Sequence, residues 1–511
     1  MGDRQVTHDP AVRPDGRDLG GFRDDTAPWG DLTVCVAGAG VSGRSVVRAL
    51  RGYGTTLVVV DGSDDTRARA NAAELEELGA TVRLGDADTL PDGVDVVVTS
   101  PGWRPDAPLF GAAAKAGVPV WGDVELAWRL RPREGAAPWL AITGTNGKTT
   151  TVRMLASILE AAGLRTEAVG NVGTPVLDAV VARDADGGPA HDVLALELSS
   201  FQLHWLERWT EEGPGRLAPR MRAAAVLNVA PDHLDWHGSA EAYAADKGRI
   251  FEGAELACVY NTADPETERL VREAEVTDGC RAIGFGLGAP GPSGLGVVED
   301  LLVDRAFVAD TRKQAVELAQ VADVVPTAPH NVANALAAAA LARAHGVTVT
   351  AVREGLRAFR PDAHRIAHVA TVDGVDYVDD SKATNGHAAA ASLAAYPSIV
   401  WVAGGLAKGA EFDGLVSGAR EHLRAAVLIG QDRAVIRDAL ERHAPDVPVI
   451  EVDATDTGAM ETVVRKAAEL ARPGDTVLLA PACASMDMFA NYGARGDAFA
   501  AAVHGLLGDA S

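Results

Sequence analysis

A short glycine-rich loop between an expected strand and an expected helix is the first feature that could do chemistry. Residues 144–150 read Gly-Thr-Asn-Gly-Lys-Thr-Thr, after an apolar run at 139–143 and before a helical stretch at 152–161. Backbone amides in such a loop, together with one ammonium and a hydroxyl, can cradle the phosphates of ATP and share a Mg²⁺. Ile142 stands where the common GxxxxGK[ST] spacing has its first glycine. The sequence therefore predicts a compact ATP-binding loop and argues against motor proteins, GTPases and transport ATPases.

Two further segments carry candidate metal ligands. The run at 192–200 has the pattern of a buried strand and ends at Glu197. In a nucleotide-binding sheet this end lies beside the phosphate loop, so Glu197 is a candidate Mg²⁺ ligand, with a solvated strand-end glutamate as the alternative. His233 lies among acids after another strand and is followed by Tyr243 and Lys247. These groups could hold a second metal, although a lone histidine is more often structural.

A second glycine-rich turn lies near the start of the chain. Residues 38–43 read Gly-Ala-Gly-Val-Ser-Gly between a strand and a helix, and Asp61 closes the next strand. Such glycines let the backbone approach a diphosphate at the helix N-terminus. A tight turn without a ligand is the alternative. Alone, the motif would indicate an NAD enzyme, but it specifies a diphosphate and not a nicotinamide.

Polar residues also follow several later strands, where open α/β sheets collect ligands. These segments are 364–365, 379–385, 404–408 and 481–487. Asn331 and Asn334 open an alanine-rich helix, and their amides could bind a purine edge or cap that helix. Only seven of the 47 basic side chains are lysines, and four of the seven lie in the motifs. A lysine amine can lose its proton and an arginine guanidinium does not.

Composition restricts the class of protein. The 511 residues have a formal net charge of −24, which disfavours nucleic acid and anionic lipid as partners, and no apolar run approaches the roughly 20 residues of a membrane span. Four scattered cysteines suggest neither a disulfide framework nor a zinc site. We therefore expect a cytoplasmic protein that does not insert into membranes.

Alternation of aliphatic runs with helical stretches starts three times, near residues 32, 139 and 375. Continuous β-branched runs are typical of parallel strands covered by helices, so the fold class is α/β with three domains. We expect a Rossmann-like domain at 31–136, a central P-loop-type ATP-binding domain at 137–360 and a C-terminal Rossmann-like domain at 361–511. The polar residues 1–30 are expected to be a disordered tail.

The ordered set of motifs resembles the Mur ligases of peptidoglycan synthesis. The resemblance rests on GTNGKTT at 144–150, GNVGTP at 170–175, ELSSFQL at 197–203, DHLDWH at 232–237, HNVAN at 330–334, HR at 364–365, DDSKATN at 379–385 and APACASMD at 480–487. DSKATN with PACAS is typical of the glutamate-adding member. The resemblance implies that ATP phosphorylates the carboxylate of UDP-N-acetylmuramoyl-L-alanine and that the amine of D-glutamate attacks the acyl phosphate. Because both steps bring anions together, charge neutralisation should dominate catalysis.

The resemblance also implies a role for individual residues. The catalytic set is Lys148, His233, Lys247 and Arg365. The ATP-binding set is Gly144, Thr145, Asn146, Gly147, Lys148, Thr149, Thr150, Asn331, Asn334, Arg365 and Asp380. The UDP-substrate set is Gly40, Val41, Ser42, Asp61, Asn171 and His233. The glutamate set is Lys382, Thr384, Lys408, Ser485 and Tyr492. Mg²⁺ would be held by Thr149, Glu197, His233 and Lys247, the last as a carbamate, which requires a nucleophilic amine.

Other functions stay open at the level of sequence. A related Mur-type ligase adding L-glutamate or another amino acid is the nearest alternative, because the sequence does not show the stereochemistry of the amino acid that is added. An NAD-dependent oxidoreductase would leave residues 144–150 unexplained, and a non-catalytic scaffold would leave the filled catalytic positions unexplained. We expect a monomer that closes around its substrates.

Overall fold

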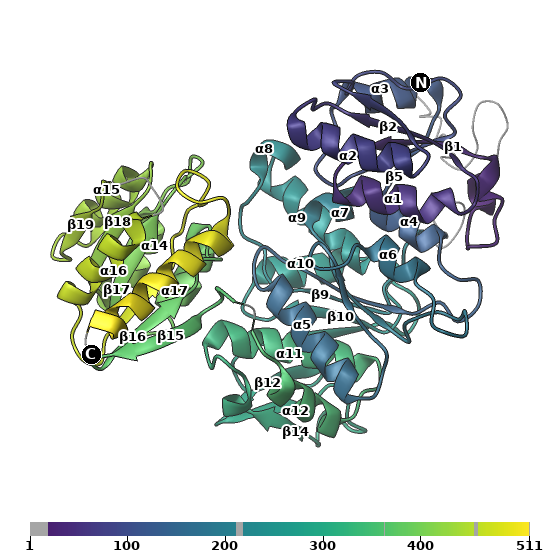
Figure 1. Ribbon diagram of the computed structural model, residues 1–511. Coiled ribbons are helices and arrows are strands. Elements are labelled where there is room, and N and C mark those ends of the chain that lie inside the picture. The colour runs from purple at the N-terminus through teal and green to yellow at the C-terminus, as the bar shows by residue number, and fades with distance from the viewer. Residues whose placement is uncertain (1–18, 211–217, 362, 454–457, 510–511) are drawn as a thin grey trace, which may run out of the picture. The chain divides into compact units, whose positions relative to one another are not determined.

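The computed structural model describes residues 19–210, 218–361, 363–453 and 458–509. The chain forms two compact units, Met1–Val324 with Val332–Phe359 and Val325–Asn331 with Arg360–Ser511. The first unit contains two sheets and the second contains one (Figure 1).

The first sheet has five parallel strands in the order β3-β2-β1-β4-β5. Its strands are β1 (Thr33–Ala37), β2 (Thr56–Asp61), β3 (Thr81–Leu84), β4 (Val96–Thr99) and β5 (Val120–Gly122), and its helices are α1 (Val41–Arg51), α2 (Thr66–Glu77), α3 (Pro108–Ala116) and α4 (Asp123–Arg129). The chain runs outward from β1 through β2 to β3 and then crosses back to β4 on the other side of β1, so the direction of the strand order reverses at β1. Ligands bind at such a reversal in open α/β sheets, and here it coincides with the glycine turn at 38–43.

The central sheet has nine strands in the order β14-β13-β12-β11-β10-β9-β6-β8-β7. Its strands are β6 (Trp139–Thr143), β7 (Ala168–Gly170), β8 (Leu194–Glu197), β9 (Ala223–Val226), β10 (Ala257–Asn261), β11 (Arg281–Phe285), β12 (Gly294–Val298), β13 (Leu301–Asp304) and β14 (Val316–Gln320). Pairing is parallel from β7 to β12, and β13 pairs antiparallel with both β12 and β14.

Helices on the central sheet supply most of the side chains considered below. They are α5 (Lys148–Ala161), α6 (Val176–Val181), α7 (Ser200–His204), α8 (Leu234–His237), α9 (Ala240–Gly248), α10 (Pro265–Glu273), α11 (Pro329–Ala344) and α12 (Val349–Ala358). The alanine-rich α11 is buried along most of its length, since small side chains let it pack closely in the core that includes α5 and α12.

The second unit has a six-stranded sheet in the order β15-β16-β20-β17-β18-β19, parallel except for the β15–β16 hairpin. Its strands are β15 (Ala367–Val372), β16 (Val375–Asp379), β17 (Ile399–Gly404), β18 (Leu423–Ile429), β19 (Val449–Glu451) and β20 (Thr476–Leu479), and its helices are α13 (Gly386–Leu393), α14 (Asp413–Ala419), α15 (Arg433–His443), α16 (Ala459–Leu470) and α17 (Tyr492–Asp509). The loops after β16, β17 and β20 leave the same edge because these strands run parallel.

These sheets confirm the predicted α/β class with several parallel-rich sheets, one for each start of the alternation. The prediction of a disordered tail over residues 1–30 is wrong for residues 19–30. Leu19, Phe22 and Trp29 are buried, and the Trp29 indole packs against the Phe22 ring at 5.0 Å. The segment is mostly polar, so its composition did not indicate that these few apolar side chains are buried. Residues 1–18 of the predicted tail lie outside the described residues.

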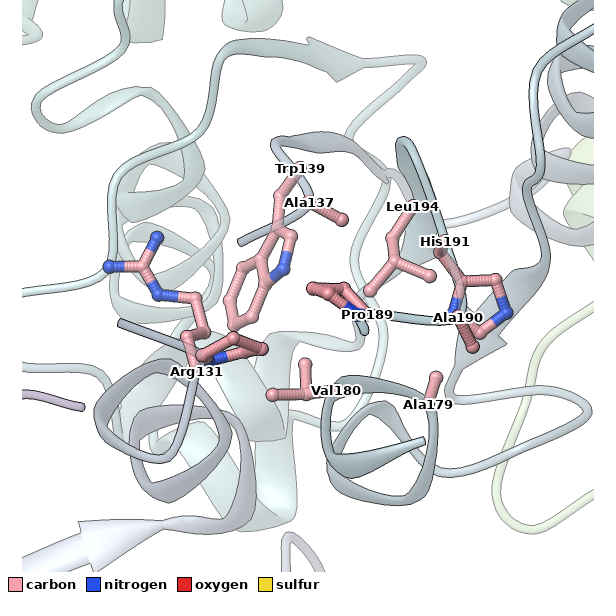
Figure 2. Close-up of a pocket in the computed structure, with 10 residues that line it drawn as sticks. Arg131, Ala137, Trp139, Ala179, Val180, Pro189, Ala190, His191 and Leu194 are labelled. Carbon is pink, nitrogen blue, oxygen red and sulfur yellow. The ribbon is translucent and has the colours of Figure 1, made fainter. Parts of the chain in front are cut away.

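A small pocket lies where the first two sheets are connected (Figure 2). It is lined by Arg131, Trp139, Val180 and Leu194, among others, and its volume of about 10 Å³ is room for one water molecule. Trp139 begins β6, whereas the loop of interest follows the other end of that strand. The pocket is therefore separate from the predicted site. Within the described part of the chain, no helix is long and apolar enough to cross a membrane.

Candidate active site

The loop at 144–147 is held in shape by side chains from neighbouring strands. Asn146 N donates to Asn228 Oδ1 at 2.9 Å, and Asn228 Nδ2 donates back to the Asn146 carbonyl at 3.1 Å. Gly147 caps α5 with a φ of 84°, and a Cβ there would lie 2.6 Å from Asn334 Oδ1. The Lys148 ammonium donates to the carbonyls of Gly144 and Thr145. The loop thus presents amides and a lysine at the start of a helix, as an anionic phosphate requires.

Lys247 approaches the same loop from α9. Its side chain is 1% exposed, and Nζ donates to the Gly144 carbonyl at 2.9 Å while lying 4.6 Å from the centre of the Tyr243 ring. Burial, and then the positive charge of Lys148, hold the pKa of Lys247 well below its usual value. A lysine amine without its proton is a nucleophile. The structure therefore places a buried lysine amine beside the candidate phosphate loop.

Glu197 lies at the end of β8, next to β6 in the sheet. Its side chain is 1% exposed, and Oε1 accepts a hydrogen bond from Asn171 Nδ2 at 2.9 Å. Oε2 is buried and has no hydrogen-bond partner among the described residues. A buried carboxylate oxygen without a partner is costly, and Mg²⁺ prefers oxygen ligands. Glu197 therefore fits a cation at this edge of the sheet.

His233 is less constrained than the other predicted ligands. It has a φ of 52°, and its side chain is 48% exposed, packing against Phe201 with ring centres 4.8 Å apart. Burial is the largest influence that lowers the pKa of His233. The described residues contain no group of three His, Cys, Asp or Glu side chains with the geometry to hold a metal. A second metal at His233 and Lys247 therefore stays a prediction.

The glycine turn of the first sheet is braced by two acids. Asp61 accepts hydrogen bonds from the amides of Ala39 and Ser63, at 2.8 and 2.9 Å. Ser42 Oγ donates to Asp123 Oδ2 at 2.8 Å, and burial raises the pKa of Asp123 to about 6. Val41 is 55% exposed on this turn. Asp61 thus supports the turn through its backbone, and its predicted contact with uracil stays a prediction.

The predicted glutamate residues gather at one edge of the second unit. Lys382 Nζ lies 4.0 Å from the centre of the Tyr492 ring, and Ser485 is buried in the loop after β20. Backbone hydrogen bonds between Leu406 and Ala484 join this loop to the one that carries the exposed Lys408. Thr384 follows Lys382 in the loop after β16. Two ammonium groups and two hydroxyl groups thus come from adjacent loops, which suits an acidic amino acid.

The residues predicted to bind the adenosine end of ATP differ in burial and in their hydrogen-bond partners. Asp380 is buried, accepting hydrogen bonds from Ile366 N and Ser392 Oγ, and burial raises its pKa to about 7. Both of its oxygens therefore have partners within its own unit. Arg365 is half-buried, next to Ile366. Asn331 Nδ2 donates to the Pro326 carbonyl at 3.2 Å, near the start of α11.

Comparison with known proteins identifies the family. Residues 142–342 match the Mur ligase middle domain, and residues 364–483 match the glutamate ligase domain of Mur ligases. The chain is 68% identical over 480 residues to a UDP-N-acetylmuramoylalanine--D-glutamate ligase of Streptomyces avermitilis, covering 94% of this chain and 99% of the relative. The chain belongs to the Mur ligase family.

Solved Mur-type ligases share the fold. A pseudomurein peptide ligase type C from Methanothermus fervidus superposes with a TM-score of 0.54 at 18% identity, over 93% of this chain and 100% of that one. The UDP-N-acetylmuramate-alanine ligase MurC from Thermotoga maritima gives 0.52 at 18% identity, with the same coverage. At such identities the likeness concerns the fold alone.

One residue of this Mur ligase was missed by sequence reasoning. Arg495 on α17 is 1% exposed and donates to Ser381 Oγ, the Ser381 carbonyl and the Cys483 carbonyl at 2.9–3.1 Å. Burial lowers the pKa of Arg495 to about 10. It thus joins two loops that carry predicted glutamate residues. The available signal was its position, since Arg495 stands on the helical stripe of the buried residues Phe499 and Val503.

Proposed function

We propose that this Mur ligase joins D-glutamate to UDP-N-acetylmuramoyl-L-alanine at the expense of ATP, in a cytoplasmic step of peptidoglycan precursor synthesis. The observation that carries the proposal is the 68% identity, along 94% of the chain, to a relative with that name. The site geometry supports it, because this chemistry requires a phosphate loop, a buried lysine amine, and lysine and hydroxyl side chains that suit an acidic amino acid. In domain terms, residues 31–136 bind the UDP substrate, 137–360 bind ATP and 361–511 bind the amino acid.

ATP binds at the loop after β6. The amides of residues 144–150 and the Lys148 ammonium hold its phosphates, and Arg365 lies beside them. At the other end of the nucleotide, Asn331 and Asn334 lie near the adenine and Asp380 lies near the ribose. Thr149 and Glu197 hold Mg²⁺, for which the unpartnered Glu197 Oε2 is the best support. Mg²⁺ supplies positive charge that neutralises the phosphate oxygens during transfer.

Lys247 contributes through its amine. Its burial and lowered pKa favour the neutral, nucleophilic form that reacts with carbon dioxide to give a carbamate. The carbamate places a negative charge where the bare lysine has none, and with His233 it holds a second Mg²⁺. An arginine cannot supply this group, which accounts for a lysine in a chain that otherwise uses arginine.

The UDP substrate binds at the first sheet. Gly40, Val41 and Ser42 lie at the diphosphate, Asp61 lies near the uracil, and Asn171 and His233 approach the sugar–alanine end. The alanine carboxylate attacks the γ-phosphorus of ATP, and ADP leaves. Lys148 stabilises the charge that builds up on the phosphate oxygens in this step.

D-Glutamate binds in the second unit. Lys382, Lys408, Thr384 and Ser485 bind its polar groups, with Tyr492 beside Lys382. Its amine attacks the acyl carbon, the tetrahedral intermediate collapses as phosphate leaves, and the nitrogen loses a proton to form the amide.

A panel of amino acids tests the proposal. The protein is incubated with ATP, Mg²⁺ and UDP-N-acetylmuramoyl-L-alanine, and phosphate release is measured for D-glutamate, L-glutamate, L-alanine and meso-diaminopimelate. We expect amino-acid-dependent release with D-glutamate and a rate at least about 100-fold lower with the others, since a misplaced amine loses the benefit of orientation. Equal release with L-glutamate, or release that ignores the amino acid, would reject the proposal.

A further inference from the structure

Helix α9 has two functional faces. Tyr243 and Lys247, four residues apart, point to the loop at 144–147, where the Tyr243 hydroxyl lies 3.0 Å from Thr145 Oγ1. Asp246 lies about 100° further around the helix, on a different face. It is only 6% exposed. A buried carboxylate beside the key lysine therefore serves something other than the phosphate loop.

Asp246 is the centre of a hydrogen-bond network. Its Oδ2 accepts from the Nδ1 atoms of both His204 and His237, each at 2.9 Å. The second nitrogen of His237 lies 3.0 Å from Ser200 Oγ, and Arg249 Nε lies 3.4 Å from Asp246 Oδ1. His204 lies on α7, His237 on α8 and Asp246 on α9, so one carboxylate connects three helices.

Each of these three helices is attached to a predicted metal ligand. Glu197 ends β8 just before α7, His233 is the residue before α8, and Lys247 follows Asp246 on α9. The first two helices have only five and four residues. Helices of about one turn are not stable by themselves and need tertiary contacts to hold them. The Asp246 network supplies such contacts between the segments that carry the ligands.

We propose that Asp246 is a positioning residue, which fixes the spacing of Glu197, His233 and Lys247 for divalent-cation binding through its hydrogen bonds to His204 and His237. The inference rests on the proposed function, because that function requires the cation. In this role Asp246 acts through its histidine partners. Ligand supports of this kind change metal affinity about 10–100-fold when removed.

Direct cation binding tests the role. Free Mn²⁺ is measured by electron paramagnetic resonance with the full-length protein and a non-hydrolysable ATP analogue, for wild type, Asp246→Ala and Asp246→Asn. Asp246→Ala should weaken Mn²⁺ binding about 10–100-fold. Asp246→Asn should fall between it and wild type, because the amide keeps one oxygen that can accept from the histidines but loses the negative charge and the second oxygen that faces Arg249. In phosphate release, the Mg²⁺ concentration for half-maximal rate should rise in parallel, with the KM for D-glutamate unchanged.

Glu241→Ala is the matched control, since it removes an exposed carboxylate from the first turn of the same helix. It should bind Mn²⁺ as wild type does. If Asp246→Ala does not fold, His204→Ala and His204→Asn carry the test, because asparagine keeps a donor near the position of Nδ1. Weaker binding in His204→Ala that His204→Asn restores would support the proposal.

A lower melting temperature with unchanged Mn²⁺ binding in Asp246→Ala, or in His204→Ala where that pair is used, would overturn the positioning role. The proposed ligase activity would be unaffected by that result. Failure of the wild-type protein to bind Mn²⁺ would overturn the metal assignment and the positioning role together, while the amino-acid panel would still decide the activity.

Discussion

Among single residues, Lys247 has the most specific proposed role, because that role depends on its amine and not on its charge. Lys247→Arg keeps a basic side chain but brings a larger, permanently charged guanidinium into a position that is 1% exposed, and it cannot form a carbamate. We expect phosphate release to fall by about 100-fold or more, the size seen when one transition-state contact is lost. Lys115→Arg, at an exposed position on α3, is the control. Wild-type activity in Lys247→Arg would reject the carbamate.

The raised pKa of Asp380 predicts that the free energy of unfolding depends on pH. Burial raises its pKa to about 7, whereas an unfolded aspartate titrates near 4. Between these values the folded state binds more protons, so the free energy of unfolding falls as pH rises, by up to about 1.4 kcal/mol per pH unit. Asp380→Asn has no proton to lose and should gain stability relative to wild type between pH 4 and 7.

Thermal unfolding at pH 5 and pH 8 checks this expectation. The melting temperature of Asp380→Asn minus that of wild type should be larger at pH 8 than at pH 5. Asp373→Asn, at an exposed position between β15 and β16, should show no such change. The same difference at both pH values would contradict the raised pKa.

Sequence patterns could identify residue types at the site but not their partners. Glu197 was recognised as a strand-end acid, whereas its unpartnered oxygen depends on how Asn171 reaches it from another loop. No sequence pattern indicated the hydrogen bonds of Asp246, because its histidine partners lie 42 and 9 residues away along the chain. Such hydrogen bonds are set by tertiary packing, which a spacing rule does not contain.

At the scale of elements, the two ends of α5 offer a matched comparison of glycines. Gly147, before the helix, and Gly163, after it, both have a left-handed φ, of 84° and 79°. A Cβ at Gly147 would lie 2.6 Å from Asn334 Oδ1, whereas nothing lies within 4 Å of one at Gly163. Both alanine variants should lose about 1–2 kcal/mol from backbone strain. Only Gly147→Ala should also lose ATP binding, because the collision must displace either the phosphate loop or Asn334, which is itself a predicted ATP-binding residue.

Titration with a fluorescent ATP analogue measures this difference, and chemical denaturation measures the shared loss of stability. We expect Gly163→Ala to bind the analogue with wild-type affinity and Gly147→Ala to bind it at least about tenfold more weakly, the equivalent of about 1.4 kcal/mol. Equal affinities in the two variants would mean that the loop tolerates the collision.

The elements themselves were largely predictable where apolar runs are continuous. The run at 139–143 matches β6. The helix expected at 152–161 instead begins at Lys148, because Gly147 adopts the left-handed cap at the end of the loop. Residues 19–30 were misjudged since two short 3₁₀ helices, Leu19–Gly21 and Trp29–Asp31, leave no periodic pattern.

At the scale of the whole molecule, repeated βα alternation predicted a multi-domain α/β chain, but not its antiparallel additions. Short turns join β12 to β13 and β15 to β16, and strands joined by tight turns pair antiparallel. Strand β14 also pairs antiparallel with β13, after a longer connection. The number of units also depends on packing and not on alternation, since the first two sheets share one unit. The prediction of a monomer stays a prediction.

In the proposed function the two units divide the predicted residues between them, so we expect the two chemical steps to be separable. Lys148 belongs to the first unit and Lys408 to the second. Lys148→Ala removes a charge needed for phosphoryl transfer, so acyl phosphate formation and ligation should both fall about 100-fold or more. Lys408→Ala removes a charge that serves D-glutamate, so ligation should fall while acyl phosphate formation persists.

Hydroxylamine separates these outcomes, because it traps the acyl phosphate as a hydroxamate without D-glutamate. Hydroxamate should form with Lys408→Ala at a rate within about threefold of wild type and be lost with Lys148→Ala, whereas phosphate release with D-glutamate should be low in both, a contrast of more than about 2 kcal/mol in barrier height. Lys313→Ala, at an exposed lysine of the first unit, should behave as wild type in both assays. An equal loss of hydroxamate in Lys408→Ala would show that the second unit acts before the amine arrives, and the division of labour would be wrong.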